Sequence, residues 1–290
     1  MATVKKLDIF DILICLALGA LVFLFIYPIY YIIVASFSHP IDILMNPVVT
    51  IPKSFTIFNY SMLFGTNTIL IGYRNTLFYV MIGTTINVSL TVWTAYGLSQ
   101  AGLPGRKYFM FFIIFTMFFS GGLIPLFLVV RNLRMLNTVW AILLPGAIST
   151  WNLMITRTYI MQQIPLELYE AAHIDGAHEY RIFFQVILPL VKPVIVVIIM
   201  FYGATIWNSW FNAMVFVQRR ELFPLQLFLR EILIHDVTGG MLDGDETERA
   251  LYLLTLRYAV MTVSILPLMI IFPFIQKHFV KGVMIGALKG

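Results

Sequence analysis

The sequence predicts an all-α integral membrane protein, and three observations carry that prediction. Hydrophobic residues make up 60% of the 290 residues, whereas soluble domains hold about 45–50% apolar residues. Charged residues make up only 11%, against about 25% in soluble domains. Several long stretches contain no Asp, Glu, Lys or Arg at all. Because a soluble chain of this size cannot hide so much apolar surface, soluble enzymes and DNA-binding domains are excluded.

The uncharged stretches are long enough to cross a bilayer as helices. A span needs about 20 apolar residues, because the hydrocarbon core is about 30 Å thick and a helix rises about 1.5 Å per residue. Barrel strands would instead form alternating segments of about ten residues, which these are not. We therefore expect one transmembrane domain, residues 1–290, with spans at about 12–38, 77–99, 108–130, 138–156, 193–217 and 258–276.

The beginning of the chain and its charges say less about topology. Lys5 and Lys6 precede an apolar run that is too long for a secretory h-region of about 7–15 residues, so we expect a retained first helix. Lys and Arg residues are spread almost evenly over the two sides of the expected topology. The positive-inside rule therefore barely decides the orientation.

Motifs for catalysis, cofactors and metals are missing from the sequence. The single cysteine, Cys15, excludes a disulfide framework. No G-x-x-x-x-G-K-[ST] motif occurs, so we expect any ATP hydrolysis to reside in another chain. His173 and His178 are five residues apart, the wrong interval for two metal ligands on one helix face. We expect neither enzymatic activity nor a metal site in this chain.

Residues 159–189, between the fourth and fifth expected spans, hold the most informative pattern. Pro165 followed by Glu167 predicts a helix start, because proline suits the first turn and an acid meets the positive end of the helix dipole. Asp175-Gly176 predicts a turn, and a second short helix is expected over 177–185. A bent helix pair outside the lipid would suit docking into a partner. An amphipathic helix lying on the membrane surface is the alternative.

The same segment carries a family resemblance. Glu170-Ala171-Ala172, three further residues, Gly176, nine further residues and Val186-Ile187-Leu188-Pro189 resemble the EAA loop of ABC importer permeases, with Val186 where the family has Ile. Asp175 extends the match to carbohydrate permeases. Other stretches are similar to maltose-type inner-membrane permeases, so that the resemblance covers nearly the whole chain: Ala95-Tyr96-Gly97-Leu98, Trp207-Asn208 and the ending Phe279-Val280-Lys281-Gly282. Phe223-Pro224-Leu225-Gln226 and the loop 231–248 resemble the branch that handles larger or acidic oligosaccharides, such as aldouronates.

The resemblance implies a type I ABC importer permease in the cell membrane, with the EAA loop and both termini in the cytoplasm. Its implied partners are a second homologous permease, two ATP-binding subunits that hold ATP and Mg, and an extracellular binding protein that delivers an oligosaccharide. No nucleic acid is implied. Coupling to the ATPases is assigned to Glu170, Ala171, Ala172, Asp175, Gly176, Leu188 and Pro189. The tail 277–290 would contact the ATPases through Lys281, Gly282 and Lys289.

Polar residues within the spans are the candidates for a sugar pathway, because aromatic faces and amides bind sugars. Asn208 and Asn212 are four residues apart in the fifth span, and the full set is Asn87, Trp151, Asn152, Trp207, Asn208 and Asn212. The alternative is that the amides join helices and the tryptophans lie at membrane interfaces. The middles of the spans lack the ionisable residues that secondary transporters usually use. An ATP-driven importer is thus favoured, and a secondary transporter or channel is the alternative.

Overall fold

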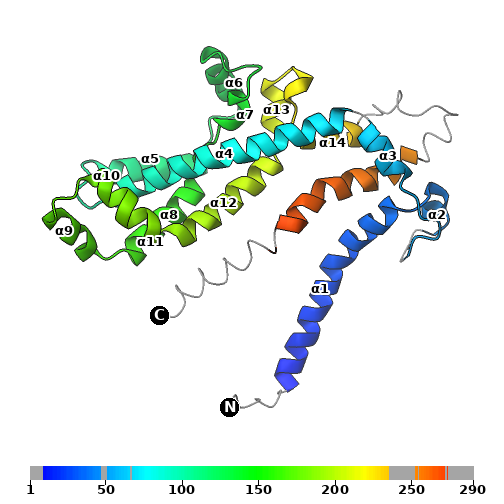
Figure 1. The fold of residues 1–290 in the computed structure, drawn as a ribbon, viewed down its shortest axis with the longest axis horizontal. Helices are drawn as coiled ribbons and strands as arrows, with labels where there is room; N and C mark the ends of the chain where they lie inside the picture. The colour runs from blue at the N-terminus through cyan, green and yellow to red at the C-terminus, as the bar shows by residue number, and fades with distance from the viewer. Residues whose placement is uncertain are drawn as a thin grey trace. The chain divides into compact units, whose positions relative to one another are not determined.

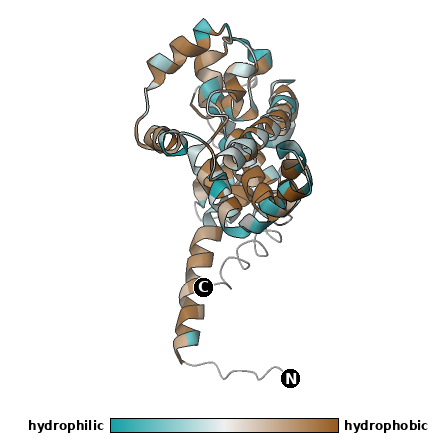
Figure 2. Cartoon of the chain, turned by 90° about the vertical axis from the view of Figure 1, so that its left-hand side faces the viewer, coloured by the Kyte–Doolittle hydropathy of each residue, from teal (hydrophilic) through white to brown (hydrophobic). Residues whose placement is uncertain are grey.

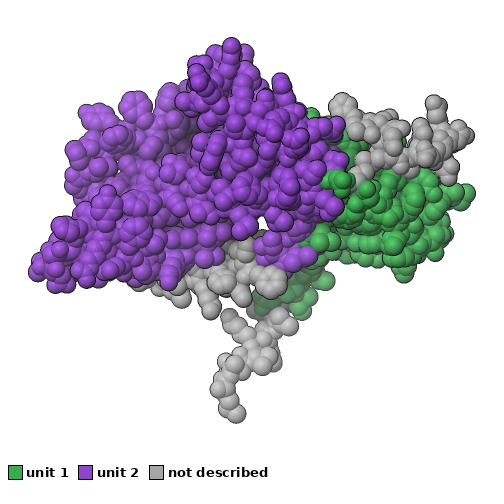
Figure 3. Space-filling view, turned by 45° about the horizontal axis from the view of Figure 1, so that its top comes forward, with its two compact units in different colours: residues 1–67, 229–266 green, residues 68–228, 267–290 purple. Residues whose placement is uncertain are grey.

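The computed structural model describes residues 9–46, 51–65, 67–234, 252–253, 255–271 and 273. This part of the chain is built from helices, with an isolated bridge pairing between Ser38 and Phe55 (Figure 1). Its contacts divide into two compact units, coloured separately in Figure 3. Unit 1 comprises residues 1–67 and 229–266, and unit 2 comprises residues 68–228 and 267–290.

Unit 1 includes α1 (Ile9–Ser36), an apolar helix that is exposed over residues 9–26 and becomes buried toward its last turn. Figure 2 shows α1 hydrophobic along almost its whole length, as expected of a helix that faces lipid or another chain. The buried end of α1 is fixed by polar contacts: Ser36 Oγ lies 2.6 Å from Tyr60 Oη, and Asn59 Nδ2 donates to the Ser36 carbonyl over 3.2 Å. Thr255 Oγ1 in turn donates to Asn59 Oδ1 over 3.0 Å. Unit 1 also contains α2 (Pro40–Met45) and α3 (Phe58–Gly65).

Unit 2 is organised along α4 (Asn67–Ser99), a helix of 33 residues. Buried polar side chains on its first half hold the loop that contains η2 (Arg220–Leu222) and leads into α14 (Leu225–Ile234). Asn75 Nδ2 donates to the carbonyls of Glu221 and Phe223 over 2.7 and 3.0 Å, and Tyr79 Oη donates to that of Leu222 over 2.7 Å. These bonds explain why polar residues occur on a helix that is apolar enough to span a membrane.

Three apolar runs that the sequence predicts as single spans are interrupted in the structure. The run 108–130 forms α5 (Arg106–Phe118) and α6 (Leu123–Asn132), which meet at 119°. The run 138–156 forms α7 (Trp140–Leu143) and the start of α8 (Thr150–Gln163), and the run 193–217 forms α12 (Lys192–Trp207) and α13 (Phe211–Phe216). Gly122, the N-cap of α6, and Gly146, between α7 and α8, have φ of 83° and 81°, positive values that glycine adopts at little cost.

Length and hydropathy alone identify two spanning helices among the described residues, α1 and α4. Counting each bent pair as one broken span raises the number to four, the second pair being Glu179–Leu190 with α12 at 78°. A shorter apolar helix covers Thr255–Ile271. The arrangement with six spans therefore stays a prediction.

Two clusters of buried apolar side chains stabilise unit 2. The first joins the second half of α4 with α8 and α12, and includes Leu153, Ile160, Ile187 and Ile198. The second joins α6, α7 and α13, which lie together in Figure 1, and includes Val130, Ile142 and Phe216. The two clusters flank the breaks in the helices, and the cavity described next lies at those breaks.

Candidate functional site

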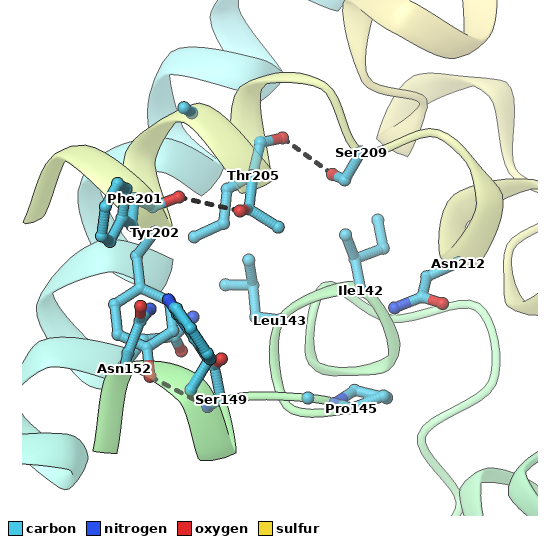
Figure 4. A pocket seen from close by; sticks show the side chains of 15 residues that line it. Ile142, Leu143, Pro145, Ser149, Asn152, Phe201, Tyr202, Thr205, Ser209 and Asn212 are labelled. Atoms are coloured by element: carbon cyan, nitrogen blue, oxygen red, sulfur yellow. Dashed lines mark hydrogen bonds between the residues drawn. The ribbon is translucent and has the colours of Figure 1, made fainter. Parts of the chain in front are cut away.

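A cavity of about 450 Å³ opens where the chain is interrupted before α8 and after α12 (Figure 4). Four of the predicted pathway residues line it together: Asn87 from α4, Trp151 and Asn152 from α8, and Asn212 from α13. The structure therefore gathers these side chains from three helices, of which α13 has only six residues. None of the residues that line the cavity carries a charge.

The amides of the cavity differ in what they bind. With its amide nitrogen turned toward them, Asn87 donates to the carbonyl oxygens of Gly83 and Ala147 over 3.0 and 3.3 Å. Asn87 thus joins α4 to the turn between α7 and α8. The amides of Asn152 and Asn212 make no hydrogen bond to other described residues, although Asn152 is only 5% exposed. These two amides remain available to a ligand.

Tyr202 fixes one wall of the cavity, although it is not among the pathway residues that the sequence predicts. Its Oη lies 2.6 Å from Thr91 Oγ1 and accepts the Ser149 N–H over 2.9 Å, so that it joins α4, α12 and the start of α8. Tyr202 and Thr205 lie three residues apart on α12, and both line the cavity. Two polar side chains at helical spacing in an otherwise apolar stretch are the signal that could have found Tyr202.

Two predicted pathway residues lie elsewhere. Asn208 is exposed, and its Nδ2 donates to the Ala204 carbonyl over 2.8 Å, which caps the end of α12. Trp207 is buried beside Tyr73, with ring centroids 6.2 Å apart, and lines a separate, mainly apolar hollow. Because α12 ends at Trp207, the helical spacing that would place Asn208 and Asn212 on one face does not hold across the break.

The segment 159–189 contains the bend that the sequence predicts. α9 (Leu166–Ile174) begins directly after Pro165, and Gly176 has φ of 74°. Then follow α10 (Glu179–Ile182), the π-helix η1 (Phe183–Ile187) and α11 (Leu188–Leu190), where the sequence predicts one short helix over 177–185. π-Helical turns frequently occur at functional sites.

One side of this segment is tied to the end of α4. Tyr96 Oη donates to Glu179 Oε2 over 2.7 Å, and His173 Nε2 lies 3.3 Å from Glu179 Oε1. The Tyr96 ring also packs on Tyr169 and Phe183, with centroids 6.4 and 5.1 Å apart. Burial raises the pKa of Tyr169 above its ordinary value, so this side chain stays neutral at physiological pH.

The other side of α9 is exposed and partly apolar. Leu168 is 41% and Ile174 is 86% exposed, and Ala171 lies between them at the helical interval of three residues. Glu167 and Glu170 are exposed beside them. Of the two alanines of the motif, Ala172 packs against the first cluster, so Ala171 is the one that a partner could approach.

The remaining predicted coupling residues have mixed positions. Asp175, Gly176 and Pro189 are exposed, and Leu188 packs partly against the first cluster. The predicted tail residues Lys281, Gly282 and Lys289 lie outside the described residues. Most of the loop 231–248, on which the resemblance to the acidic-oligosaccharide branch rests, lies outside them as well.

Comparison with known proteins identifies the family. The family of binding-protein-dependent transport system inner membrane components matches residues 69–285. The chain belongs to this family. The resemblance to ABC importer permeases is thereby confirmed: the chain is a permease of this family, and its relatives are named for sugar transport.

Several members resemble the chain over its whole length. The polygalacturonan/rhamnogalacturonan transport system permease protein YtcP of Bacillus subtilis is 38% identical over 98% of this chain and 100% of its own length. The galactooligosaccharides transport system permease protein GanQ of the same organism is 32% identical, over 95% and 94%. A crystal structure of a bacterial ABC transporter involved in the import of the acidic polysaccharide alginate has a TM-score of 0.82 at 30% identity, covering 96% of this chain and 99% of that one.

Proposed function

We propose that the chain is one membrane-spanning half of an ATP-driven importer, which moves an oligosaccharide from an extracellular binding protein into the cytoplasm. Its relatives are named for transport of galactooligosaccharides, arabinooligosaccharides and polygalacturonan, and the similar crystal structure for import of alginate. Membership of the binding-protein-dependent family favours this function over a secondary transporter or channel. A second permease and two ATP-binding subunits complete the proposed complex.

The observation that carries the proposal is the exposed face of α9. Leu168, Ala171 and Ile174 present apolar surface to water, and covering such surface contributes about 25 cal/mol per Å². The small Ala171 between two large side chains allows a partner to approach closely. Glu167 and Glu170 make the rim acidic, so a cleft with basic residues would be complementary. We assign this face to the ATPase subunit, which places α9 and both termini in the cytoplasm.

The connectivity behind α9 supports transmission to the sugar pathway. α9 continues through α10, η1 and α11 into α12, and α12 carries Tyr202 and Thr205 in the cavity wall. A second link runs from Glu179 through Tyr96 into α4, which carries Asn87 of the same wall. Movement of α9 with the ATPase would thus displace two walls of the cavity. We place Asn87, Trp151, Asn152 and Asn212 on the pathway, and the six spans around it.

The test uses the complete complex in liposomes. Ala171→Glu adds a bulky charge to the proposed contact and is expected to reduce ATP-dependent sugar uptake and stimulated ATP hydrolysis by about tenfold or more. Ala101→Glu makes the same change on the exposed turn after α4, and its uptake should stay within about twofold of wild type. Equal activity of both variants would contradict the docking face, and uptake without ATP would support a secondary transporter.

A further inference from the structure

We propose that the cavity holds a carboxylate of the sugar at the amino-terminal end of α8, so that this chain recognises acidic sugar residues. The inference rests on the proposed function, because it assigns a substrate class to the same cavity. It depends on two independent features of the described residues: an open helix N-terminus and a buried amide without a partner.

The first feature is the start of α8, a helix of 14 residues. Its N-cap residue Ser149 makes no capping bond through its side chain, and the Ser149 N–H is taken by Tyr202 Oη over 2.9 Å. The N–H groups of Thr150, Trp151 and Asn152 have no partner among the described residues. Such an end behaves as about half a positive charge with free donors, which suits an anion.

The second feature is Asn152 itself. Its side chain is 5% exposed, lines the cavity and makes no hydrogen bond to another described residue. Its amide atoms are not enclosed by protein, so they open into the cavity, where a ligand oxygen can accept from the amide nitrogen. Ser149, also at the cavity wall, adds a hydroxyl at the same place. Figure 4 shows Ser149 and Asn152 together at this end of α8.

The facing end of α12 opposes this positive end only in part. Of its last four carbonyls, those of Ala204 and Ile206 accept from Asn208 Nδ2 and Ser209 Oγ, each over 2.8 Å. At the first turn of α8 the N–H groups of Thr150, Trp151 and Asn152 are open. No lining residue carries a charge, so no ionised side chain in the cavity wall repels an anion at this end of α8.

The size and walls of the cavity select the kind of anion. A volume of about 450 Å³ lies in the range of about 300–1,000 Å³ typical of small-molecule sites, far more than one inorganic ion needs. Trp151 and Phe201 line it beside the polar groups, and aromatic faces of this kind can pack on a sugar ring. A carboxylated sugar matches the donors and the aromatic walls at once.

The experiment compares digalacturonate with its carboxyl-reduced, neutral counterpart on the reconstituted importer complex. Asn152→Asp places a negative charge at the α8 terminus. We expect digalacturonate uptake to fall by about tenfold or more relative to wild type, with the neutral disaccharide within about twofold. Because each sugar is compared with its own wild-type rate, preferences of the binding protein cancel. Asn132→Asp, exposed at the end of α6, is the matched control and should affect neither sugar.

Binding to the wild-type complex, followed through tryptophan fluorescence, keeps the inference testable if Asn152→Asp fails to assemble. Digalacturonate should bind about tenfold more tightly than the neutral disaccharide. The inference is overturned if digalacturonate does not bind, or binds no more tightly than the neutral disaccharide. It is also overturned if Asn152→Asp reduces uptake of both sugars equally. Either result leaves the proposed function unaffected. A wild-type complex that takes up neither sugar with ATP speaks against the proposed function, and the binding comparison still decides the carboxylate site.

Discussion

Removing one hydroxyl should weaken the link between the EAA segment and α4. Tyr96→Phe deletes the donor to Glu179 Oε2 at 2.7 Å but keeps the ring that packs on Phe183 and Tyr169. The Tyr96 side chain is buried, so phenylalanine fits the same space. The variant therefore isolates the hydrogen bond from the packing around it.

The expected magnitude follows from the kind of bond and its exposure. Hydrogen bonds to charged groups contribute about 1.5–3 kcal/mol. The Glu179 side chain is 60% exposed, so water replaces part of the lost interaction, and we take about 1–1.5 kcal/mol. About 1.4 kcal/mol corresponds to a tenfold change in an equilibrium. We expect the locally open state, in which residues 179–187 are separated from α4, to become about five- to tenfold more populated.

Hydrogen exchange of the complex measures this population directly. Amides of residues 179–187 should exchange about five- to tenfold faster in Tyr96→Phe, and binding-protein-stimulated ATP hydrolysis should fall with less change in basal hydrolysis. Glu179→Gln and the double variant complete a thermodynamic cycle. If the two single effects simply add in the double variant, Tyr96 and Glu179 do not interact in the way described, and the reasoning is refuted.

Three further predictions concern unit 2 and its loops. Gly72→Ala should lower the free energy of unfolding by about 1–3 kcal/mol, seen as a lower thermal midpoint, because its Cβ would lie 3.0 Å from the Leu225 backbone. The control Gly97→Ala should be neutral or stabilising, because no atom lies within 4 Å of its Cβ. Asn75→Leu should destabilise by about 2–4 kcal/mol in denaturation of the purified protein, because two carbonyls of the loop 221–223 lose their donor; an unchanged midpoint would contradict this. Gly176→Ala should destabilise the turn by about 1–2 kcal/mol, measured as faster hydrogen exchange of its backbone amides. The cause is the φ of 74° at this position, because no atom lies close enough to clash with an added Cβ.

Local features of the EAA segment could be read from the residues alone. α9 begins directly after Pro165, and the turn that follows α9 contains Gly176. Proline fixes φ at its own position, and glycine allows a positive φ at its own. The assignment to the membrane proteins likewise followed from composition, because the total amount of apolar side chain decides whether a soluble fold could bury it. Such properties need no knowledge of what lies across the fold.

The grouping of side chains at the cavity needed the tertiary structure. Asn208 and Asn212 share a face only if the helix is continuous, and α12 ends at Trp207, so one amide caps that helix and the other lines the cavity. Asn87 and Asn152 are both buried amides in uncharged runs, yet one is satisfied by carbonyls and the other is not.

The sequence by itself determined that the chain lies in a membrane, is helical and carries an EAA segment, because these depend on composition and short-range pattern. The tertiary structure decided where the helices break, which amide stays open and that Tyr202 joins three segments. The physical reason is that the hydrogen-bond partners of these groups, and the residues around a helix terminus, lie far apart in the chain. No local sequence pattern specifies which of them come into contact.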